Sequence, residues 1–296
     1  MKTVVYQSFR TRDVPAWIAA CMESVRFWAA GQGFAYRFFD DRFFDFVPDD
    51  LRERASVHKC ILADYARLVA AQQLLAEGWD RVVWLDADAL VFAPESFVLS
   101  IDSRYAFCRE VWLDRITLGQ PQFRLTVNNS ISIFCRDEAI IDFYLDAAKA
   151  ILRSQEPLNA LSIGTDFLLR LRRARQFPLV TSMGIFGPEM AYRYLQNDGR
   201  FLRQYLSYQT SPIYAANLCL SHQSDGQNAT AAVKRLIWDE AEMLAFIRRL
   251  QSDGGRSLNA WFEPAYSPSS TEFDRPLSRY LGVKYALKSL LAVARS

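Results

Sequence analysis

The segment Val82 to Phe92 reads Val-Val-Trp-Leu-Asp-Ala-Asp-Ala-Leu-Val-Phe, and it decides how the rest of the chain is interpreted. It begins with an unbroken apolar run, which is typical of a strand buried on both faces of a sheet. Asp86 and Asp88 follow where that strand would end, and alternate residues of an extended chain project to the same side. Because open α/β sheets bind ligands at the carboxyl ends of their strands, the two carboxylates mark a candidate binding site.

The chain on either side of this segment alternates short β-like runs with stretches of helical periodicity. Strands are predicted at residues 4–6, 34–39, 82–85, 128–134 and 212–220, and helices at 14–28, 59–77, 138–152, 164–175, 231–250 and from near 276 onward. This order predicts an α/β fold with a mainly parallel central sheet and helices on both faces. The composition shifts past Gly254, so we expect one domain at residues 1–253 and a C-terminal extension at 254–296.

The composition is that of an ordinary folded protein, with 51% hydrophobic and 23% charged residues in 296. Lys and Arg number 35 against 33 Asp and Glu, and this net charge of +2 argues against a dedicated nucleic-acid binder. The cysteine count is odd (5) and no Cys-x-x-Cys pair occurs, so we expect buried thiols rather than disulfides or a zinc site. No apolar run reaches the length of a membrane span or a secretory signal, so a cytoplasmic location is expected.

The aspartate pair has a direct physical interpretation. Two neighbouring carboxylates repel each other unless a cation lies between them. Hard divalent ions such as Mn²⁺ or Mg²⁺ take oxygen ligands and share their remaining positions with water and phosphate oxygens. Asp86 and Asp88 therefore predict a metal ion that holds a diphosphate. The alternative is a turn after the strand, in which one Asp caps the next element.

The stretch from Ala63 to Phe92 contains Ala-Asp-Tyr-Ala-Arg-Leu, a helix closed by Gly78, and the D-x-D segment. It resembles the core of GT-A-fold glycosyltransferases of the glycogenin and lipopolysaccharide galactosyltransferase type. The resemblance implies a Rossmann-like GT-A fold, a nucleotide-diphospho-sugar donor such as a UDP-sugar, and Asp86 and Asp88 as metal ligands, with Asp86 also near the donor ribose. Asp64 and Arg67 match positions that face the donor, and their spacing places them on one helical face. The alternative for this pair is an ion pair on the helix surface.

The resemblance implies further contacts to the donor. His222 would be a third metal ligand from a late loop, although the family motif around it matches only in part; the alternative is a structural histidine. Asn128 and Asn129 would bond the donor sugar, because an amide can both donate to and accept from hydroxyl groups. A turn before a strand is the alternative for these two. Gln7 and Ser8 follow the first predicted strand and would contact the nucleotide.

Two features concern the acceptor. Asp166 lies near the start of a predicted helix and would orient the acceptor hydroxyl or take its proton; the alternative is a first-turn residue that stabilises the helix dipole. The segment from Arg275 to Ser296 has basic residues and no acidic one, and its apolar positions form a stripe. Such a helix either lies on an anionic membrane surface or packs on the domain. Membrane contact would suit a lipid-linked acceptor.

Together these observations predict a metal-dependent hexosyltransferase that moves a sugar from a nucleotide-diphospho-sugar to a hydroxyl of a glycan or lipid-linked glycan. Retention of the anomeric configuration is favoured over inversion by the resemblance. The metal would neutralise the charge that develops on the leaving diphosphate, and Arg67 would add a second positive charge. One alternative is a haloacid-dehalogenase-like phosphatase, but its later Gly-Asp-x-x-x-Asp motif is missing. The other is a protein that binds a sugar nucleotide or glycan without catalysis.

Overall fold

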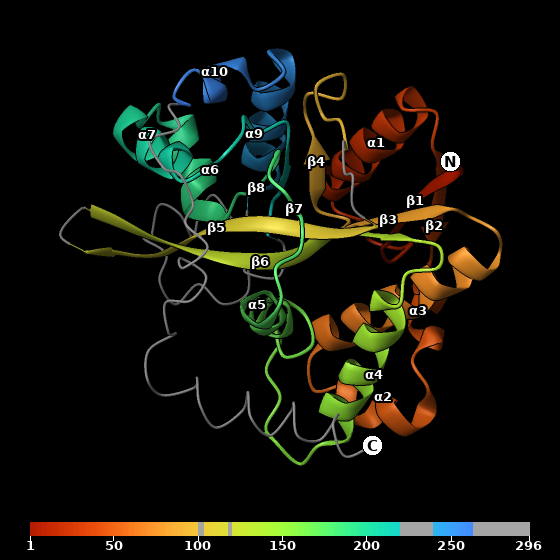
Figure 1. The fold of residues 1–296 in the computed structure, drawn as a ribbon. Coiled ribbons are helices and arrows are strands. Elements are labelled where there is room, and N and C mark those ends of the chain that lie inside the picture. Colours follow the sequence, from red (N-terminus) through yellow and green to blue (C-terminus); the bar gives the residue numbers. More distant parts are fainter. Residues whose placement is uncertain (100–103, 118–119, 220–238, 263–296) are drawn as a thin grey trace.

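The computed structural model of the chain describes residues 1–99, 104–117, 120–219 and 239–262. In this part of the chain a central six-stranded sheet has the strand order β2-β1-β3-β6-β5-β7. The strands are β1 (Thr3–Ser8), β2 (Ala35–Phe39), β3 (Arg81–Leu85), β5 (Tyr105–Thr117), β6 (Gln120–Cys135) and β7 (Leu179–Val180). Figure 1 shows this sheet nearly edge-on, between two layers of other elements.

The central sheet is mixed, with parallel pairing predominant. Strand β1 is parallel to both β2 and β3, and β7 is parallel to β5. Strand β6 is antiparallel to β3 on one side and to β5 on the other. The predicted α/β fold with a mainly parallel sheet is therefore confirmed, with β6 as the antiparallel insertion.

The central strands read as continuous apolar runs because each of their faces is buried. In β3, Val82 and Trp84 belong to the hydrophobic core on one face, and Val83 and Leu85 belong to the core on the other. Successive side chains of a strand point to opposite faces, so an unbroken apolar run supplies both cores at once. This is the pattern on which the prediction of the strand at residues 82–85 depended.

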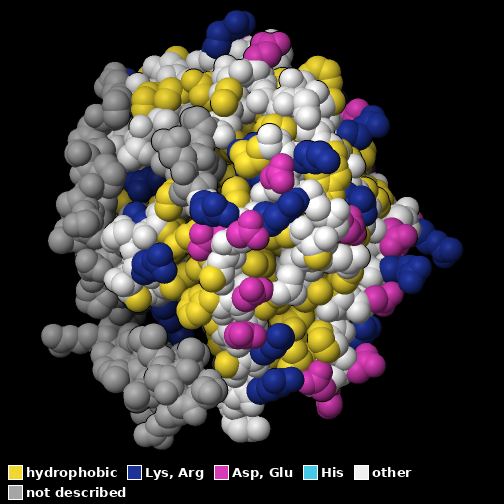
Figure 2. Space-filling model, turned by 45° about the vertical axis from the view of Figure 1, so that its right-hand side comes forward, with side chains coloured by type: hydrophobic (Ala, Val, Ile, Leu, Met, Phe, Trp, Pro, Cys, Tyr) yellow, Lys and Arg dark blue, Asp and Glu magenta, His cyan; other side chains and the backbone are white. Residues whose placement is uncertain are grey.

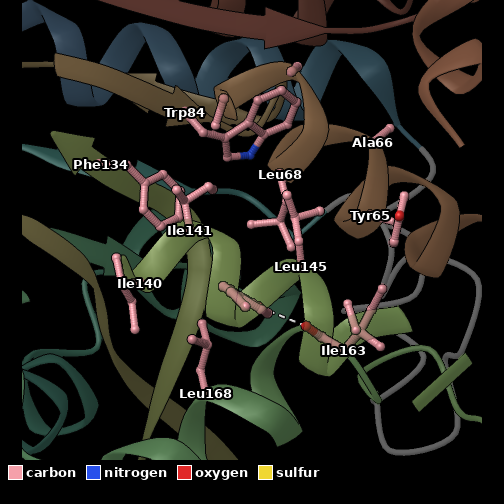
Figure 3. Close-up of a cluster of buried hydrophobic side chains, with 14 of the residues drawn as sticks. Tyr65, Ala66, Leu68, Trp84, Phe134, Ile140, Ile141, Leu145, Ile163 and Leu168 are labelled. Atoms are coloured by element: carbon pink, nitrogen blue, oxygen red, sulfur yellow. Dashed lines mark hydrogen bonds between the residues drawn. The ribbon is translucent and has the colours of Figure 1, made fainter. Parts of the chain in front are cut away.

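One face of the sheet is covered by helices. They are α2 (Asp49–Ala55), α3 (Lys59–Ala76), α4 (Ile140–Arg153) and α5 (Thr165–Ala174), together with the short helix η1 (Asp41–Phe46). Figure 3 shows Leu68 of α3 facing Leu145 of α4, with Leu168 of α5 below them. In the same cluster the Tyr144 hydroxyl donates a hydrogen bond of 2.7 Å to the carbonyl oxygen of Ile163, which fixes the segment before α5 to α4. Helix α3 ends at Ala76, and Gly78 in the turn after it has a φ of +103°, which suits glycine.

The prediction that helices cover both faces of the sheet is only partly right, because the second face is covered differently. It is covered by α1 (Ala16–Gly31) and by a small three-stranded sheet, within the described residues, of order β4-β9-β8. These strands are β4 (Ala89–Val91), β8 (Met183–Ile185) and β9 (Ala215–Asn217). Helices α6 (Pro188–Leu195), α7 (Gly199–Ser207), α9 (Glu240–Ser252) and α10 (Arg256–Asn259) lie beyond them. The D-x-D segment thus connects β3 of the large sheet to β4 of the small one.

Several predicted boundaries differ from those observed. The strand predicted at residues 128–134 is the end of β6, which begins at Gln120 and forms a long hairpin with the unpredicted strand β5. Within the described part of the strand predicted at 212–220, only β9 is a strand, and residue 220 lies outside the described residues. Pro15 takes the position before the first turn of α1, so this helix starts at Ala16 and not at residue 14. The predicted start of a helix at residue 231 and the predicted basic helix near the C-terminus lie outside the described residues.

The surface agrees with the small net charge. On the face shown in Figure 2, basic and acidic side chains are interspersed. All of the cysteines are free thiols, and Cys21, Cys108 and Cys219 are buried, as expected. No helix in the described ranges is long and apolar enough to cross a membrane.

The first residues of the predicted C-terminal extension pack against the small sheet. Asn259 of α10 donates a hydrogen bond of 2.8 Å to the carbonyl oxygen of Ile213, and its side-chain oxygen accepts one of 2.9 Å from the Ile213 amide. Leu258 is fully buried. The extension from residue 263 onward lies outside the described residues, so a separate unit at 254–296 stays a prediction.

Two adjacent glycines test this packing. Gly254 and Gly255 both have positive φ, at +60° and +72°. A Cβ on Gly254 would lie 3.8 Å from the Ala93 Cβ, whereas one on Gly255 would overlap the buried ring of Phe92. We expect Gly254→Ala to lower the free energy of unfolding by about 1 kcal/mol, the cost of the left-handed backbone, and Gly255→Ala by about 2–4 kcal/mol. Urea denaturation of both variants measures the difference, and equal effects would contradict the packing of α10 on Phe92.

Candidate functional site

The candidate site lies where β3 ends and where β6 shifts its register with β5. Leu85 of β3 pairs with Ile131 of β6, and the amide of Asp86 donates a hydrogen bond of 2.9 Å to the Ser130 carbonyl oxygen. On the other side of β6, the pairing with β5 shifts between Ser132 and Asn128. Residues 129–131 therefore form a bulge that faces the D-x-D segment.

The carboxylate of Asp86 is held on one oxygen by two donors. Its Oδ1 accepts a hydrogen bond of 2.6 Å from Trp84 Nε1 and lies 3.0 Å from Arg67 Nη1. Its carbonyl oxygen accepts a hydrogen bond of 2.9 Å from Gln7 Nε2. These contacts fix the carboxylate so that Oδ2 faces the side-chain nitrogen of Asn217.

Asp86 and Asp88 converge on a single atom of the small sheet. The side-chain nitrogen of Asn217 donates to Asp88 Oδ1 at 2.8 Å and to Asp86 Oδ2 at 3.2 Å. Asn217 ends β9, which pairs with β4, and its Oδ1 accepts from the amide of Cys219 at 2.8 Å. The two carboxylates therefore project to one side, as the D-x-D spacing predicts, and an amide N–H group lies between them.

Arg67 connects three elements through its guanidinium group. Nη2 lies 2.8 Å from Asp64 Oδ1, and Nη1 donates a hydrogen bond of 2.9 Å to the carbonyl oxygen of Asn129, in addition to its contact with Asp86. Its central carbon lies 4.8 Å from the centre of the Trp84 ring, a cation–π contact. Burial opposes the charge, but Asp86 and Asp64 raise the pKa of Arg67 above its ordinary value. Asp64 and Arg67 do form an ion pair, as in the alternative interpretation, but the pair is buried and does not lie on the helix surface. Their predicted role toward the donor stays a prediction.

Asp64 is the most enclosed carboxyl group of the cluster. It accepts a hydrogen bond of 2.9 Å from Asn129 Nδ2, and Gly164 packs against its other oxygen so closely that a Cβ there would lie 2.5 Å from Oδ2. Gly164 precedes the first turn of α5, so the start of that helix lies against the carboxylate. Burial raises the pKa of Asp64 to about 6, against the opposing effects of Arg67 and Asn129.

The two asparagines predicted to bond the donor sugar lie inside β6, so the alternative of a turn before a strand is wrong. They point to different partners. Asn129 is buried and bonds Asp64, whereas Asn128 is half-buried and donates a hydrogen bond of 3.0 Å to Glu110 of β5. Of the two asparagines, Asn128 is therefore the one that keeps an exposed part.

The other predicted site residues lie around this cluster. Gln7 is fully buried and, besides bonding the Asp86 carbonyl oxygen, accepts a hydrogen bond of 2.9 Å from the Tyr36 hydroxyl, so it positions the end of β3. Ser8 is the last residue of β1. Asp166 lies in the first turn of α5 and accepts a hydrogen bond of 3.1 Å from Asn159. His222 lies outside the described residues. The roles assigned to these residues stay predictions.

Four residues of the site were not foreseen: Trp84, Glu110, Gly164 and Asn217. Asn217 carried the clearest signal, because a polar residue follows two alanines in a predicted strand, as Asp86 follows its own apolar run. The other three are recognised only by their neighbours in space. Within the described ranges no group of three or more His, Cys, Asp or Glu side chains is arranged to hold a metal, so Asp86 and Asp88 are a two-carboxylate set there.

The enclosure of Asp64 generates a pH prediction. Its pKa is 3.8 in the ordinary state and about 6 in the fold, so between these values the folded protein binds more protons here than the unfolded chain does. The contribution of this carboxyl to the free energy of unfolding therefore falls as pH rises, by about 3 kcal/mol in total. Asp64→Asn lowers the free energy of unfolding relative to wild type. We expect this loss to shrink by about that amount as pH rises from 3.8 to about 6 and beyond.

Urea denaturation at several pH values measures the difference between the two proteins. Asp45→Asn provides the exposed control, since this carboxylate lies on the surface of η1 and outside the buried network around Arg67. A cost of Asp64→Asn that instead grows with pH would show that the ion pair with Arg67 outweighs burial.

No protein-family model matches the chain, and no curated protein sequence matches it. Among solved structures, a glycosyltransferase involved in the glycosylation of the major capsid of PBCV-1 is similar with 11% identity, over 83% of this chain and 100% of that one, at a TM-score of 0.42. Mouse xyloside xylosyltransferase 1 has 10% identity over 73% of this chain and 97% of its own, at 0.41. The glycosyltransferase GlyE of Streptococcus pneumoniae TIGR4 has 10% identity over 90% of this chain and 66% of its own, at 0.36. Similarity at this distance does not identify the function of the chain.

Proposed function

We propose that the protein is a metal-dependent glycosyltransferase of the GT-A type, which transfers a sugar from a nucleotide-diphospho-sugar to a hydroxyl group of a glycan or lipid-linked acceptor. The observation that carries the proposal is the convergence of Asp86 Oδ2 and Asp88 Oδ1 on one side-chain nitrogen of Asn217. This point lies at the carboxyl end of β3, where α/β sheets bind ligands. The resemblance of residues 63–92 to the GT-A core supports the same conclusion.

The donor set suits a hard divalent cation. Asp86 and Asp88 each direct a carboxylate oxygen to the same point, and Mn²⁺ and Mg²⁺ prefer oxygen ligands. Asn217 could add its amide oxygen only by turning its amide over, which would break the hydrogen bond that this oxygen accepts from the Cys219 amide. When bound, the cation would offset the negative charge that develops on the leaving diphosphate.

The buried network behind the carboxylates keeps them in register. Trp84 and Arg67 occupy Oδ1 of Asp86, and Oδ2 faces Asn217 at the point where a cation would bind. Arg67 makes its contacts with Asp64, Asp86 and the Asn129 carbonyl oxygen, so in this state its charge serves the protein and orients Asp86. We propose that Asn128 bonds the sugar, and that Asp166, at the start of α5, acts toward the acceptor.

The first test is metal-dependent nucleotide binding. We expect Asp88→Asn to abolish the stabilisation of the protein by a nucleoside diphosphate with Mn²⁺, because one of the two converging carboxylates is lost. Thermal unfolding with UDP, GDP and their sugar derivatives, each with and without Mn²⁺, measures this. The release of nucleoside diphosphate from the matching sugar derivative in the presence of acceptor glycans measures transfer.

Asp80→Asn is a suitable control, because this aspartate lies at the opposite end of β3 and pairs with Arg136 at 3.3 Å. It should retain the response to Mn²⁺ and nucleotide. Nucleotide binding that is unchanged in Asp88→Asn would contradict the proposal, and phosphate release from a phosphomonoester that depends on Asp86 would favour the phosphatase alternative.

The second test uses Asn217. Asn217→Asp places three carboxylates around one point, so without metal their repulsion should lower the thermal stability. A bound cation removes this repulsion, so we expect the stabilisation by Mn²⁺ to be larger in this variant than in wild type. Thermal unfolding across a Mn²⁺ titration measures both effects. If Mn²⁺ stabilises the variant no more than wild type, the cation does not bind between Asp86 and Asp88.

A further inference from the structure

Glu110 of β5 is a buried carboxyl group to which the proposed function gives no role. Only 5% of the residue is exposed, and its Oε1 accepts a hydrogen bond of 3.0 Å from Asn128 Nδ2. Asn128 precedes the bulge of β6, where the ladder with β5 shifts its register. The pair thus joins the two strands of the long hairpin beside the place where β6 meets the D-x-D segment.

The amide of Asn128 is held at both ends. Its nitrogen donates to Glu110, and its oxygen accepts a hydrogen bond of 2.7 Å from the amide of Ser130. Each contact allows only one orientation of the amide, so together they decide which way its oxygen and nitrogen point. One N–H and one lone pair of the side chain remain for a further partner, which is the set that a sugar hydroxyl uses.

Glu110 lies on the same side as the aspartate pair. The buried thiol of Cys219 has a pKa raised above its ordinary value, first by burial and then by the charges of Asp88, Glu110 and Asp86. The hydrogen bonds give the position of the pair: Asn128 Oδ1 accepts from the amide of Ser130, and the Ser130 carbonyl oxygen accepts from the amide of Asp86. The contact between Glu110 and Asn128 therefore borders the proposed donor site.

We propose that Glu110 is a positioning residue that orients the amide of Asn128 toward the sugar of the bound donor, so that recognition of the sugar depends on the ionisation of Glu110. This inference rests on the proposed function. It assigns Glu110 no contact with the reacting atoms, because its observed contact is with Asn128.

The charges around Glu110 set the direction of the effect. Burial raises the pKa of Glu110 to about 7, while Asn128 and the charge of Arg124 oppose the rise. Among the described residues, Glu110 also interacts with the thiols of Cys108 and Cys219, whose pKa values are themselves raised by burial. Strand β8, which packs against β5, brings Met183, Gly184 and Ile185 and no titratable side chain.

Ionised Glu110 accepts a charge-assisted hydrogen bond, and protonation weakens it. Sugar recognition is therefore strongest above the pKa and weakens below it.

Glu110→Gln tests the inference, because the amide keeps an acceptor for Asn128 but cannot ionise. With Mn²⁺ present, we expect the wild-type affinity for a nucleotide sugar to fall about fivefold from about pH 8 to about pH 6, relative to the affinity for the nucleoside diphosphate alone. The variant should show the weaker affinity at both pH values. Isothermal titration calorimetry of both ligands on wild type and variant measures these four affinities at each pH.

A second readout needs no ligand. The ¹⁵N signals of the Asn128 side chain, assigned by their loss in Asn128→Ala, should titrate with a midpoint near that of Glu110 in wild type and stay constant in Glu110→Gln. Glu138→Gln is the control, since this glutamate pairs with Arg104 at the opposite end of the hairpin; it should behave as wild type in both measurements.

The possible failures are distinguishable. A pH step in sugar affinity that persists in Glu110→Gln, or Asn128 signals that do not titrate in wild type, would overturn the role of Glu110 while leaving the proposed function intact. Absence of any nucleotide binding would overturn the proposed function, and the role in sugar recognition with it.

Discussion

The buried charge of Arg67 is the constraint on which the candidate site depends. Removing a guanidinium group from water costs several kcal/mol, and the cost is offset only by well-placed partners. Here the partners come from separate parts of the chain: Asp64 from the same helix, Asp86 from the end of β3, and the carbonyl oxygen of Asn129 from the bulge of β6. Loss of any one partner would leave a charge unpaired in the interior. The cost of burying the guanidinium group therefore fixes the relative positions of α3, the end of β3 and the bulge of β6.

The elements that local patterns determine could be predicted from the sequence. The apolar run at Val82 to Leu85 and the helical spacing of α3, closed by Gly78, depend on neighbouring residues only, and both were found. Strand β5 was not predicted because charged residues such as Arg109 and Glu110 interrupt its alternation, and they become buried only through tertiary contacts. The bulge of β6 arises from competing registers with β3 and β5, and no local signal carries that information.

The same division holds for the site. Asp86 and Asp88, and likewise Asp64 and Arg67, are close in sequence, so their spacing alone predicts a shared face. Asn217 reaches the aspartates only because β9 pairs with β4, more than a hundred residues away along the chain. Gln7 shows that local sequence does not determine which group a strand-end side chain contacts. Its position after an apolar run suggested a ligand contact, but whether a strand-end amide faces a ligand or the protein depends on neighbours such as Tyr36.

Trp84 belongs both to the aromatic core and to the hydrogen-bond network of the candidate site. Its ring stacks on Phe43 at 5.6 Å between ring centres and meets the edge of Tyr6 at 5.1 Å, while its indole nitrogen bonds Asp86. Any replacement of the indole removes both a large volume from the aromatic packing and a donor from the carboxylate. A homologue that lacks this tryptophan therefore needs two compensating changes, one that fills the space beside Phe43 and one that supplies a new hydrogen-bond donor for Asp86. We expect Trp84, Phe43 and Asp86 to vary together among homologues.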